Sequence, residues 1–340
     1  MAESYAENFL AFALNNLIYY DLTQIILFIH RLQQSMYEAD YGSKDSTTYP
    51  ERLSVFCDKL QKEGTISKSC LTPSDQLVCV LITPLMQRCL EGVIQANELM
   101  FVDSTGNCDR HGVRIFLLLT HCAAGGVPIG CILTTSETEE TLSFAFELYK
   151  TMLPTSAFPA SVSHGPDVIM TDDCDEERAA LRKAFPDALL LLCIFHVLQA
   201  GWRWLNKTEH HIPKEKRQDL YYRLKSLLYA ESEEKMVEII HKAENEVEED
   251  NFVKYMCSKF ERRMEMGLCF RKNTFIRGNN TNNYCEAAMK VLKDCVLQRT
   301  KAYNILQLAE FVSSRLERYY KILLASTANG KTKKVKASPV

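Results

Sequence analysis

Residues 98–103 read ELMFVD and residues 168–172 read VIMTD, and both runs end in an acidic residue. Short apolar runs of this kind are typical of buried strands, which places Asp103 and Asp172 at strand ends. A third acidic residue, Glu286, lies in the segment TNNYCEAA, which reads as the start of a helix. Two strand ends and one later helix can bring three carboxylates to a single point.

Three converging carboxylates supply the hard oxygen ligands that divalent cations prefer, and they leave positions open for water and phosphate. Two cations held in this way catalyse in-line attack on a phosphodiester. The pattern therefore predicts a nuclease or transposase core, with Asp103, Asp172 and Glu286 as catalytic residues and ligands of two Mg²⁺ or Mn²⁺ ions. The alternative is that these are three ordinary surface acids, since the chain contains 43 acidic residues.

Cys193 and His196 form a second group of candidate side chains. They are only two potential ligands, whereas a structural zinc site uses four, so zinc is not expected. We interpret them as a pair that supports the active site, because strand ends gather there. Asn283 is a further candidate for a supporting role, since it precedes Glu286 by one helical turn.

The composition bounds the class of protein. The chain has 340 residues, of which 46% are hydrophobic and 24% charged, as in a globular protein with a sizeable core. The formal net charge of −3 gives no overall basic field, so any DNA contact must come from a local patch or from another domain. Thirteen scattered cysteines favour reduced thiols in an intracellular protein. No apolar run has the roughly 18 residues that span a bilayer, so no membrane partner is expected.

The hydrophobic pattern predicts an ordered series of elements between residues 98 and 195. Strands are expected at 98–103, 113–122, 127–133, 168–172 and 188–195, with helices at 138–152 and 175–185. Turn residues between the first three strands favour an antiparallel meander. The order β-β-β-α-β-α-β is that of a ribonuclease H-like α/β fold, a mixed sheet with flanking helices. Before this series, we expect a helix at 1–40, a linker at 41–75 and a helix at 77–96.

The chain from Asp172 to Glu286 is too long for a plain connection, and its pattern is helical almost throughout. A helical insertion domain explains this spacing. The predicted organisation is an N-terminal helical region and linker at 1–75, the first part of the core at 76–205, the insertion at 206–275, C-terminal core helices at 276–326 and a basic disordered tail at 327–340.

Four blocks of the sequence occur in an order that resembles one known family. They are FVDSTG at 101–106, MTDD at 170–173, CIFHVLQAGWRWL at 193–205 and RGNNTNNYCEA at 277–287. They resemble, in turn, the first two catalytic blocks, the Cys-x-x-His segment with its tryptophan-bearing helix, and the third catalytic block of Mutator-like element (MULE) transposases. The resemblance covers about residues 75–325.

The resemblance implies a transposase catalytic domain that cleaves and transfers DNA strands by a DDE-type mechanism in the nucleus. Its partners would be DNA at transposon ends and at the target, and a homo-oligomer is an open alternative to a monomer. The chain is similar above all to animal members of the family, some of which carry a SWIM-type zinc finger. The Cys-x-Cys and Cys-x-His patterns of that finger do not occur here, which puts end recognition by this chain alone in doubt.

Residues next to the acidic trio have two possible roles. Neighbours on a strand point to opposite sides, so Asp173 or Asp175 is expected to cap the following helix. Lys290 and Lys293 share one helical face with Glu286, and we interpret this face as meeting metal and phosphate. The alternative is a solvated stripe in which Lys290 pairs with Glu286.

A basic region at residues 259–277 leads into the third block and is the best candidate for phosphate contact. From it, Arg271, Lys272 and Arg277 are predicted to bind DNA, although a charged face of the insertion is an equal alternative. Trp202 is predicted to stack on an extruded base, with helix packing as the alternative.

Two other functions are compatible with the sequence. The chain is then either a domesticated or decayed transposase that binds DNA or protein without cleaving it, or a ribonuclease. The net negative charge and the absent zinc patterns favour the first of these, whereas the intact acidic trio argues against it.

Overall fold

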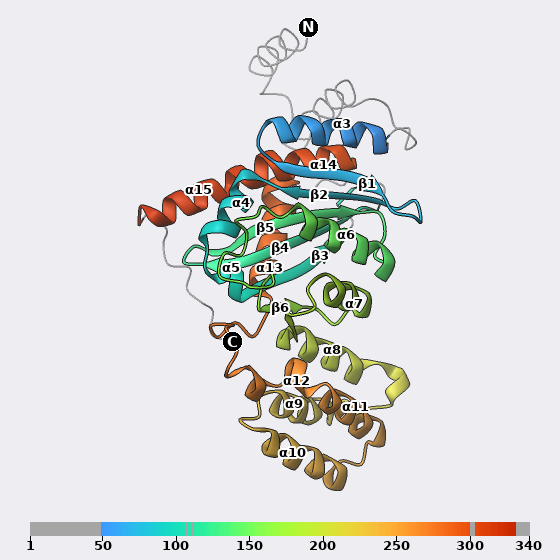
Figure 1. The fold of residues 1–340 in the computed structure, drawn as a ribbon. Helices are drawn as coiled ribbons and strands as arrows, with labels where there is room; N and C mark the ends of the chain where they lie inside the picture. Colours follow the sequence, from blue (N-terminus) through green and yellow to red (C-terminus); the bar gives the residue numbers. More distant parts are fainter. Residues whose placement is uncertain (1–48, 107, 110–111, 300–302, 331–340) are drawn as a thin grey trace, which may run out of the picture.

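The computed structural model describes residues 49–106, 108–109, 112–299 and 303–330, and its centre is a mixed seven-stranded sheet (Figure 1). The helix expected at 1–40 and residues 331–340 of the predicted tail lie outside the described residues. The disordered tail predicted from residue 327 begins too early, because residues 327 and 328 end a helix. The order of the strands across the sheet is β1-β2-β5-β4-β3-β6-β7. The strands are β1 (Ile66–Leu71), β2 (Leu77–Ile82), β3 (Leu99–Thr105), β4 (Arg114–Cys122), β5 (Gly125–Thr134), β6 (Val168–Thr171) and β7 (Leu189–Leu192).

The pairing of β3 to β7 places the strand ends that matter for the site. Strands β3, β4 and β5 form the antiparallel meander that the sequence predicted. Strand β6 runs parallel to β3, with Phe101 opposite Met170, and β7 runs parallel to β6. Asp103 and Asp172 each follow that register pair by two residues. The two acids therefore emerge side by side at the carboxyl ends of neighbouring parallel strands.

The helix predicted at 77–96 is wrong for its first part, because residues 77–82 form β2. The run LVCVLI is buried at every position between β1 and β5. A short run that is apolar on both faces has no period that separates strand from helix. The helix α4 (Pro84–Gly92) begins only afterwards, with Thr83 as its cap and Pro84 in its first turn, where proline is tolerated.

The predicted linker at 41–75 is also wrong over its described part. Residues 49–71 form α3 (Tyr49–Lys62) and the edge strand β1, and α3 buries Leu53, Phe56 and Leu60 in the main core. The glycine and proline residues that suggested a linker mark the ends of these elements. Gly64, for example, has a φ of 88° and ends α3.

Two helices, α6 (Glu139–Met152) and α7 (Asp175–Ala184), pack against each other beside the sheet. Helix α6 contacts β2 and β5. Thr138 caps α6 by accepting a hydrogen bond from the backbone amide of Thr141. Helix α7 follows β6 directly and connects it to β7, as in a parallel crossover.

Residues 206–275, all of them described, contain helices and no strand. Together with α8 they bury a second hydrophobic cluster around Leu224, Phe252 and Met256, separate from the cluster of the sheet. Figure 1 shows this helical body beside the β6 side of the sheet. Its helices are α8 (Ile194–Asn206), α9 (Arg217–Leu228), α10 (Glu233–Glu246), α11 (Asp250–Glu261) and α12 (Arg263–Met266).

The chain then returns to the sheet through α13 (Asn283–Val291), which contacts β3, β4 and β5. Helices α14 (Ile305–Phe311) and α15 (Glu317–Ala328) follow, and α14 contacts α3. Among the described residues, no helix has both the length and the apolar character that crossing a bilayer requires. All thirteen cysteines are described and none forms a disulfide.

Candidate active site

Four segments of the chain meet at the carboxyl ends of β3 and β6. The segment before α13 connects them, because the side chain of Asn282 donates a hydrogen bond to the carbonyl of Val102 (3.3 Å). The backbone amide of Asn282 also donates to the sulfur of Cys193 (3.1 Å). One residue thus bridges the end of β3 and the start of α8. Asp103 and His196 lie beside these two anchor points.

His196 contacts two of the three predicted acidic residues. Its Nδ1 atom forms an ion pair with Oδ1 of Asp172. Its Nε2 atom lies 3.4 Å from Oε1 of Glu286. The carboxylate of Asp172, followed by the thiol of Cys193, raises the pKa of His196 to about 10. The imidazole is therefore protonated at neutral pH and lies as a cation between two carboxylates.

Asp103 is the third member of the group. Burial and then the charge of Asp172 raise the pKa of Asp103 to about 7, and the charge of Glu286 acts in the same direction. The backbone amide of Ser104 partly offsets this by donating to Oδ1 of Asp103 (2.7 Å). The structure thus brings Asp103, Asp172 and Glu286 close enough to interact electrostatically.

Glu286 is oriented by the packing of α13 on the sheet. Tyr284 stacks on His121 with ring centroids 5.9 Å apart, and it meets Phe101 edge to face at 5.5 Å. Gly126 lies against the same tyrosine, since a Cβ atom there would come within 2.8 Å of the Tyr284 Cβ. Gly126 therefore permits close approach of α13 to β5. This role adds to the turn between strands that the sequence predicted.

Glu177 is a fourth acidic residue of this region, and the sequence analysis missed it. It lies in the first turn of α7, it is 5% exposed, and its Oε1 atom has no hydrogen-bond partner. Burial first, and then the charges of Asp172 and Asp103, raise the pKa of Glu177 well above its usual value. Its signal in the sequence was its place in the helix that directly follows the Asp172 strand, because first-turn side chains lean back toward the strand end.

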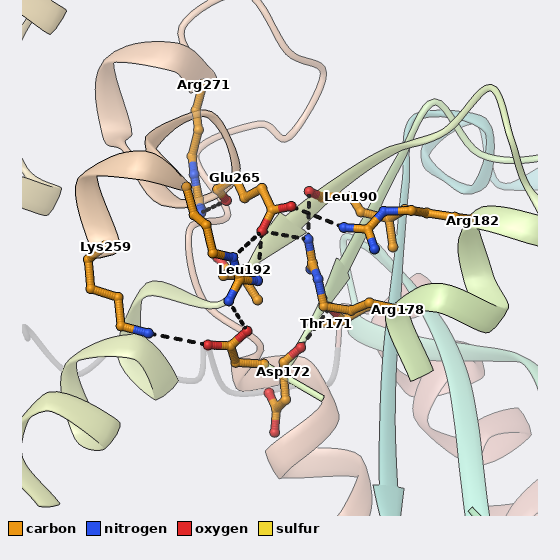
Figure 2. Close-up of polar contacts among 11 residues, drawn as sticks. Thr171, Asp172, Arg178, Arg182, Leu190, Leu192, Lys259, Glu265 and Arg271 are labelled. Carbon is orange, nitrogen blue, oxygen red and sulfur yellow. Dashed lines mark hydrogen bonds and ion pairs between the residues drawn. The ribbon is translucent and has the colours of Figure 1, made fainter. Parts of the chain in front are cut away.

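Asp173 does not cap α7, contrary to the expectation that it or Asp175 would. The cap position is Cys174, whose side chain forms no capping bond. The carboxylate of Asp173 instead accepts from Arg262 of the insertion at 2.7 Å, with Lys259 at 3.5 Å. Figure 2 shows these contacts beside Asp172. Two nearby cations outcompete the helix amides for this carboxylate.

Arg271 is not a surface contact for DNA, which corrects its assignment. It is 3% exposed, and its guanidinium donates to the carbonyls of Leu192 and Asn280. Arg277 pairs with Glu98 at 2.5 Å, and Lys272 donates to a backbone carbonyl at 2.7 Å. The basic region at 259–277 thus makes mainly intramolecular contacts. These contacts favour the alternative that the region is a charged face of the insertion.

The remaining DNA-binding candidates lie at the surface. Asn283, Glu286, Lys290 and Lys293 are all exposed on the same side of α13 and its continuation. Glu286 contacts His196 rather than Lys290. Trp202 is 44% exposed and packs edge to face on Tyr221 at 5.6 Å. It therefore packs against a helix, as the alternative to base stacking predicted, but part of its ring remains exposed.

Residues 99–200 match the model of the MULE transposase domain, which confirms the family resemblance for this part of the chain. The matched segment contains Asp103, Asp172 and His196 and ends before Glu286. Residues 99–200 thus resemble a MULE transposase domain, and they contribute strands β3 to β7 of the mixed sheet.

The chain is also similar to a PKS-NRPS hybrid synthetase, cheA, of Chaetomium globosum, with 26% identity over 127 residues. These residues are 37% of this chain and only 3% of the synthetase. A likeness of that extent carries no argument about function.

Proposed function

We propose that this chain is the catalytic core of a DDE-type transposase with a ribonuclease H-like fold, which cleaves DNA strands and joins them to a target. The observation that carries the proposal is the aligned register of β3 and β6, which brings Asp103 beside Asp172, while His196 links Asp172 to Glu286. The strand order and the MULE match of residues 99–200 support it.

The donor atoms at this site fit divalent cations in kind. Asp103, Asp172 and Glu286 offer carboxylate oxygens, and the buried side-chain Oδ1 atom of Asn282 has no hydrogen-bond partner. Oxygen ligands of this type are those that Mg²⁺ and Mn²⁺ prefer. Within the described part of the chain, however, no group of three His, Cys, Asp or Glu side chains is arranged to hold a metal ion. His196 lies between the carboxylates of Asp172 and Glu286, and it would have to move away for a metal ion to bind both of them.

The three carboxylates would hold the metal, which when bound activates the attacking oxygen and stabilises the leaving oxygen. The residues of the chain have separate tasks. Asp172 and Glu286 hold the imidazolium of His196, which keeps two like charges close together before substrate binds. Asp103 stays ionised only above about pH 7, because burial and Asp172 oppose its charge. Asn282 fixes the distance between the β3 end and α8.

The substrate of this site would be duplex DNA at transposon ends and at a target, in the nucleus. Lys290 and Lys293 supply positive charge on the face of α13 that carries Glu286, and the open side of Trp202 is suited to stacking on a base. These assignments, like the choice between monomer and homo-oligomer, are part of the proposal.

The test is nicking of a labelled duplex by purified protein with Mg²⁺ or Mn²⁺. Asp103→Asn, Asp172→Asn and Glu286→Gln should each lower the rate by about 1000-fold or more, because groups that act as one unit fail together. Glu140→Gln, at an exposed position on α6, is the matched control and should keep the wild-type rate. Wild-type levels of nicking in the three variants would refute the assignment.

A second candidate is a domesticated or decayed transposase that binds DNA or protein without cleaving it. The observation that favours it is that most basic side chains of residues 259–277 are paired within the chain and no three-donor metal group is formed among the described residues. Retained duplex binding with no metal-dependent nicking at any metal concentration would select this candidate.

A further inference from the structure

The helical insertion contacts the end of β6 on both sides of Asp172. The contacts come from a short stretch of the insertion, formed by Lys259, Arg262 and Glu265, which we name the insertion clamp. Lys259 belongs to α11 and Glu265 to α12, and Arg262 lies between these two helices. Figure 2 shows Lys259 and Glu265 near Asp172. The proposed function does not use these three residues, and they lie 87 or more positions beyond Asp172 in the sequence.

On one side of Asp172, the clamp holds Asp173. Arg262 Nη1 lies 2.7 Å from Oδ1 of Asp173, and Lys259 Nζ lies 3.5 Å from its Oδ2. The side chains involved are 13% to 33% exposed, so solvent screens these pairs less than it screens pairs at an open surface. Two cations on two different oxygens restrict both the position and the rotation of the carboxylate.

On the other side of Asp172, the clamp acts through Arg178 of α7. The Arg178 side chain is fully buried and donates to the hydroxyl of Thr171 (2.9 Å) and to the carbonyl of Leu190 (3.4 Å). Its charge is balanced by Glu265 of the insertion at 3.0 Å. A buried guanidinium needs such a partner, because an uncompensated buried charge is strongly destabilising.

Glu265 ties the two sides together. One of its oxygens is shared by Arg178 and Arg262, and the other accepts from Arg182 at 3.0 Å. Arg262 in turn bridges Glu265 and Asp173. The contacts form a closed path from Thr171 through Arg178, Glu265 and Arg262 to Asp173, which encloses Asp172 along the backbone.

We propose that the insertion clamp is a positioning device for the active site: Arg262 and Glu265 set the place of the Asp172 carboxylate by fixing the residues before and after it. This inference rests on the proposed function, because it assigns Asp172 a role that requires exact placement. Arg262 and Glu265 are positioning residues, since they contact neighbours of Asp172 rather than the acid itself. Outer contacts of this type typically change metal affinity or activity by about 10–100-fold.

The test compares Arg262→Gln with Arg223→Gln. Both arginines carry two acidic partners and are similarly exposed, at 33% and 30%, but Arg223 pairs with Asp219 and Glu246 inside the insertion and does not reach the sheet. Mn²⁺ binding is measured by calorimetry, and kcat and KM for duplex nicking are measured separately. Hydrogen exchange of the peptide covering residues 168–175 reports the strand end itself.

We expect Arg262→Gln to weaken Mn²⁺ binding about tenfold, to lower kcat with little change in KM, and to speed exchange at 168–175. Arg262→Lys, which keeps the charge, should recover part of each loss. Arg223→Gln should match wild type in all three measurements. If the role of Arg262 is only structural, Arg262→Gln should lower the melting temperature, but its kcat and Mn²⁺ affinity should equal those of Arg223→Gln.

Failure of this inference is distinguishable from failure of the proposed function. If wild type binds Mn²⁺ through Asp172 and nicks DNA, and Arg262→Gln does both equally well, the clamp is overturned and the proposed function stands. If wild type neither binds Mn²⁺ nor nicks DNA, the proposed function fails, and the clamp as a device for this active site is overturned with it.

Discussion

At the scale of single residues, the site concentrates negative charge at one place. Asp103, Asp172 and Glu286 lie together, and the buried Glu177 adds a fourth acidic group nearby. The cation of His196 offsets part of this charge. Burial first, and then repulsion by the neighbouring acids, raise the pKa of Asp103 to about 7 and the pKa of Glu177 well above its usual value. A site under such repulsion has a ready affinity for cations.

Glu177 gives a pH-dependent stability that can be measured without metal. Its pKa is raised in the folded state, so its contribution to stability is fully present below its unfolded value of about 4.5 and is lost as pH rises toward the folded value. Glu177→Gln removes this loss. In EDTA, the variant should gain on wild type as pH rises above about 5, by up to about 1.4 kcal/mol per pH unit.

Urea unfolding of both proteins at several pH values measures this difference. Glu140→Gln, exposed in the first turn of α6, controls for the chemical change itself. A Glu177→Gln variant that is less stable than wild type at every pH would mean that the carboxylate is buried with a favourable partner, contrary to its unpaired Oε1.

Lys290 tests the DNA-facing side of the site. It is exposed one turn after Glu286, and Glu286 itself is engaged by His196. Lys290→Glu should weaken duplex binding. It should also reduce the slope of the logarithm of the binding constant against the logarithm of salt concentration by about one, because one phosphate contact is lost. A fluorescent duplex titrated at several salt concentrations gives both quantities. Lys62→Glu at the end of α3 is the control, and a slope equal to that control would remove Lys290 from the interface.

At the scale of elements, the helix α13 decides whether Glu286 reaches the strand ends. Its approach to β5 depends on Gly126, because any Cβ there would collide with Tyr284. The approach also depends on the hydrogen bonds of Asn282 to β3 and α8. A small displacement of α13 therefore separates Glu286 from His196 without unfolding the sheet.

Gly126→Ala should displace α13 and destabilise the protein by about 1–3 kcal/mol, the usual cost of overpacking. Gly92→Ala is the control, because nothing lies within 4 Å of a Cβ atom there and the residue ends a helix. Chemical denaturation measures the stabilities, and Mn²⁺ affinity reports the site. Equal free energies of unfolding of the two variants would show that Tyr284 can move away from a Cβ atom at residue 126 without destabilising the protein.

Strands β3 to β7 were predictable because their apolar runs are bounded by clear turn residues. The strand β2 was not, because a six-residue apolar run has no period of its own, and pairing with β1 and β5 decided its structure. Asp103, Asp172 and Glu286 were placed in the sequence by local setting and by family blocks. The ion pairs of Asp173 and the hydrogen bond of Arg271 to Leu192 join residues more than 70 positions apart, and no local pattern specifies them.

At the scale of the whole molecule, the described residues form two hydrophobic clusters, one in the sheet and one in the insertion. They are joined by α8, which starts beside Asp172 and ends inside the helical body. Residues that contact only the second cluster should therefore control the stability of the insertion more than that of the sheet. Leu224 is such a residue, since it is fully buried and packs against Gly201 of α8.

Leu224→Ala should lower the stability of the insertion by about 2–5 kcal/mol. Hydrogen exchange should become faster in α9, α10 and α11, while β3, β4 and β5 keep most of their protection. Leu119→Ala, at an equally buried position of β4, is the reference for damage to the sheet. Equal acceleration in both parts of the Leu224→Ala variant would show that the two clusters unfold as one unit.

The entry and exit of the insertion lie next to each other, since the backbone amide of Ile194 donates to the carbonyl of Asn280 at 3.1 Å. A chain that leaves and returns at one point can be lengthened, shortened or exchanged there without stretching the framework. A change in the length of the helical body would therefore leave the position of Glu286 on α13 unaltered. A replacement insertion would have to supply new partners for the carboxylate of Asp173 and the guanidinium of Arg178, which Lys259, Arg262 and Glu265 provide here.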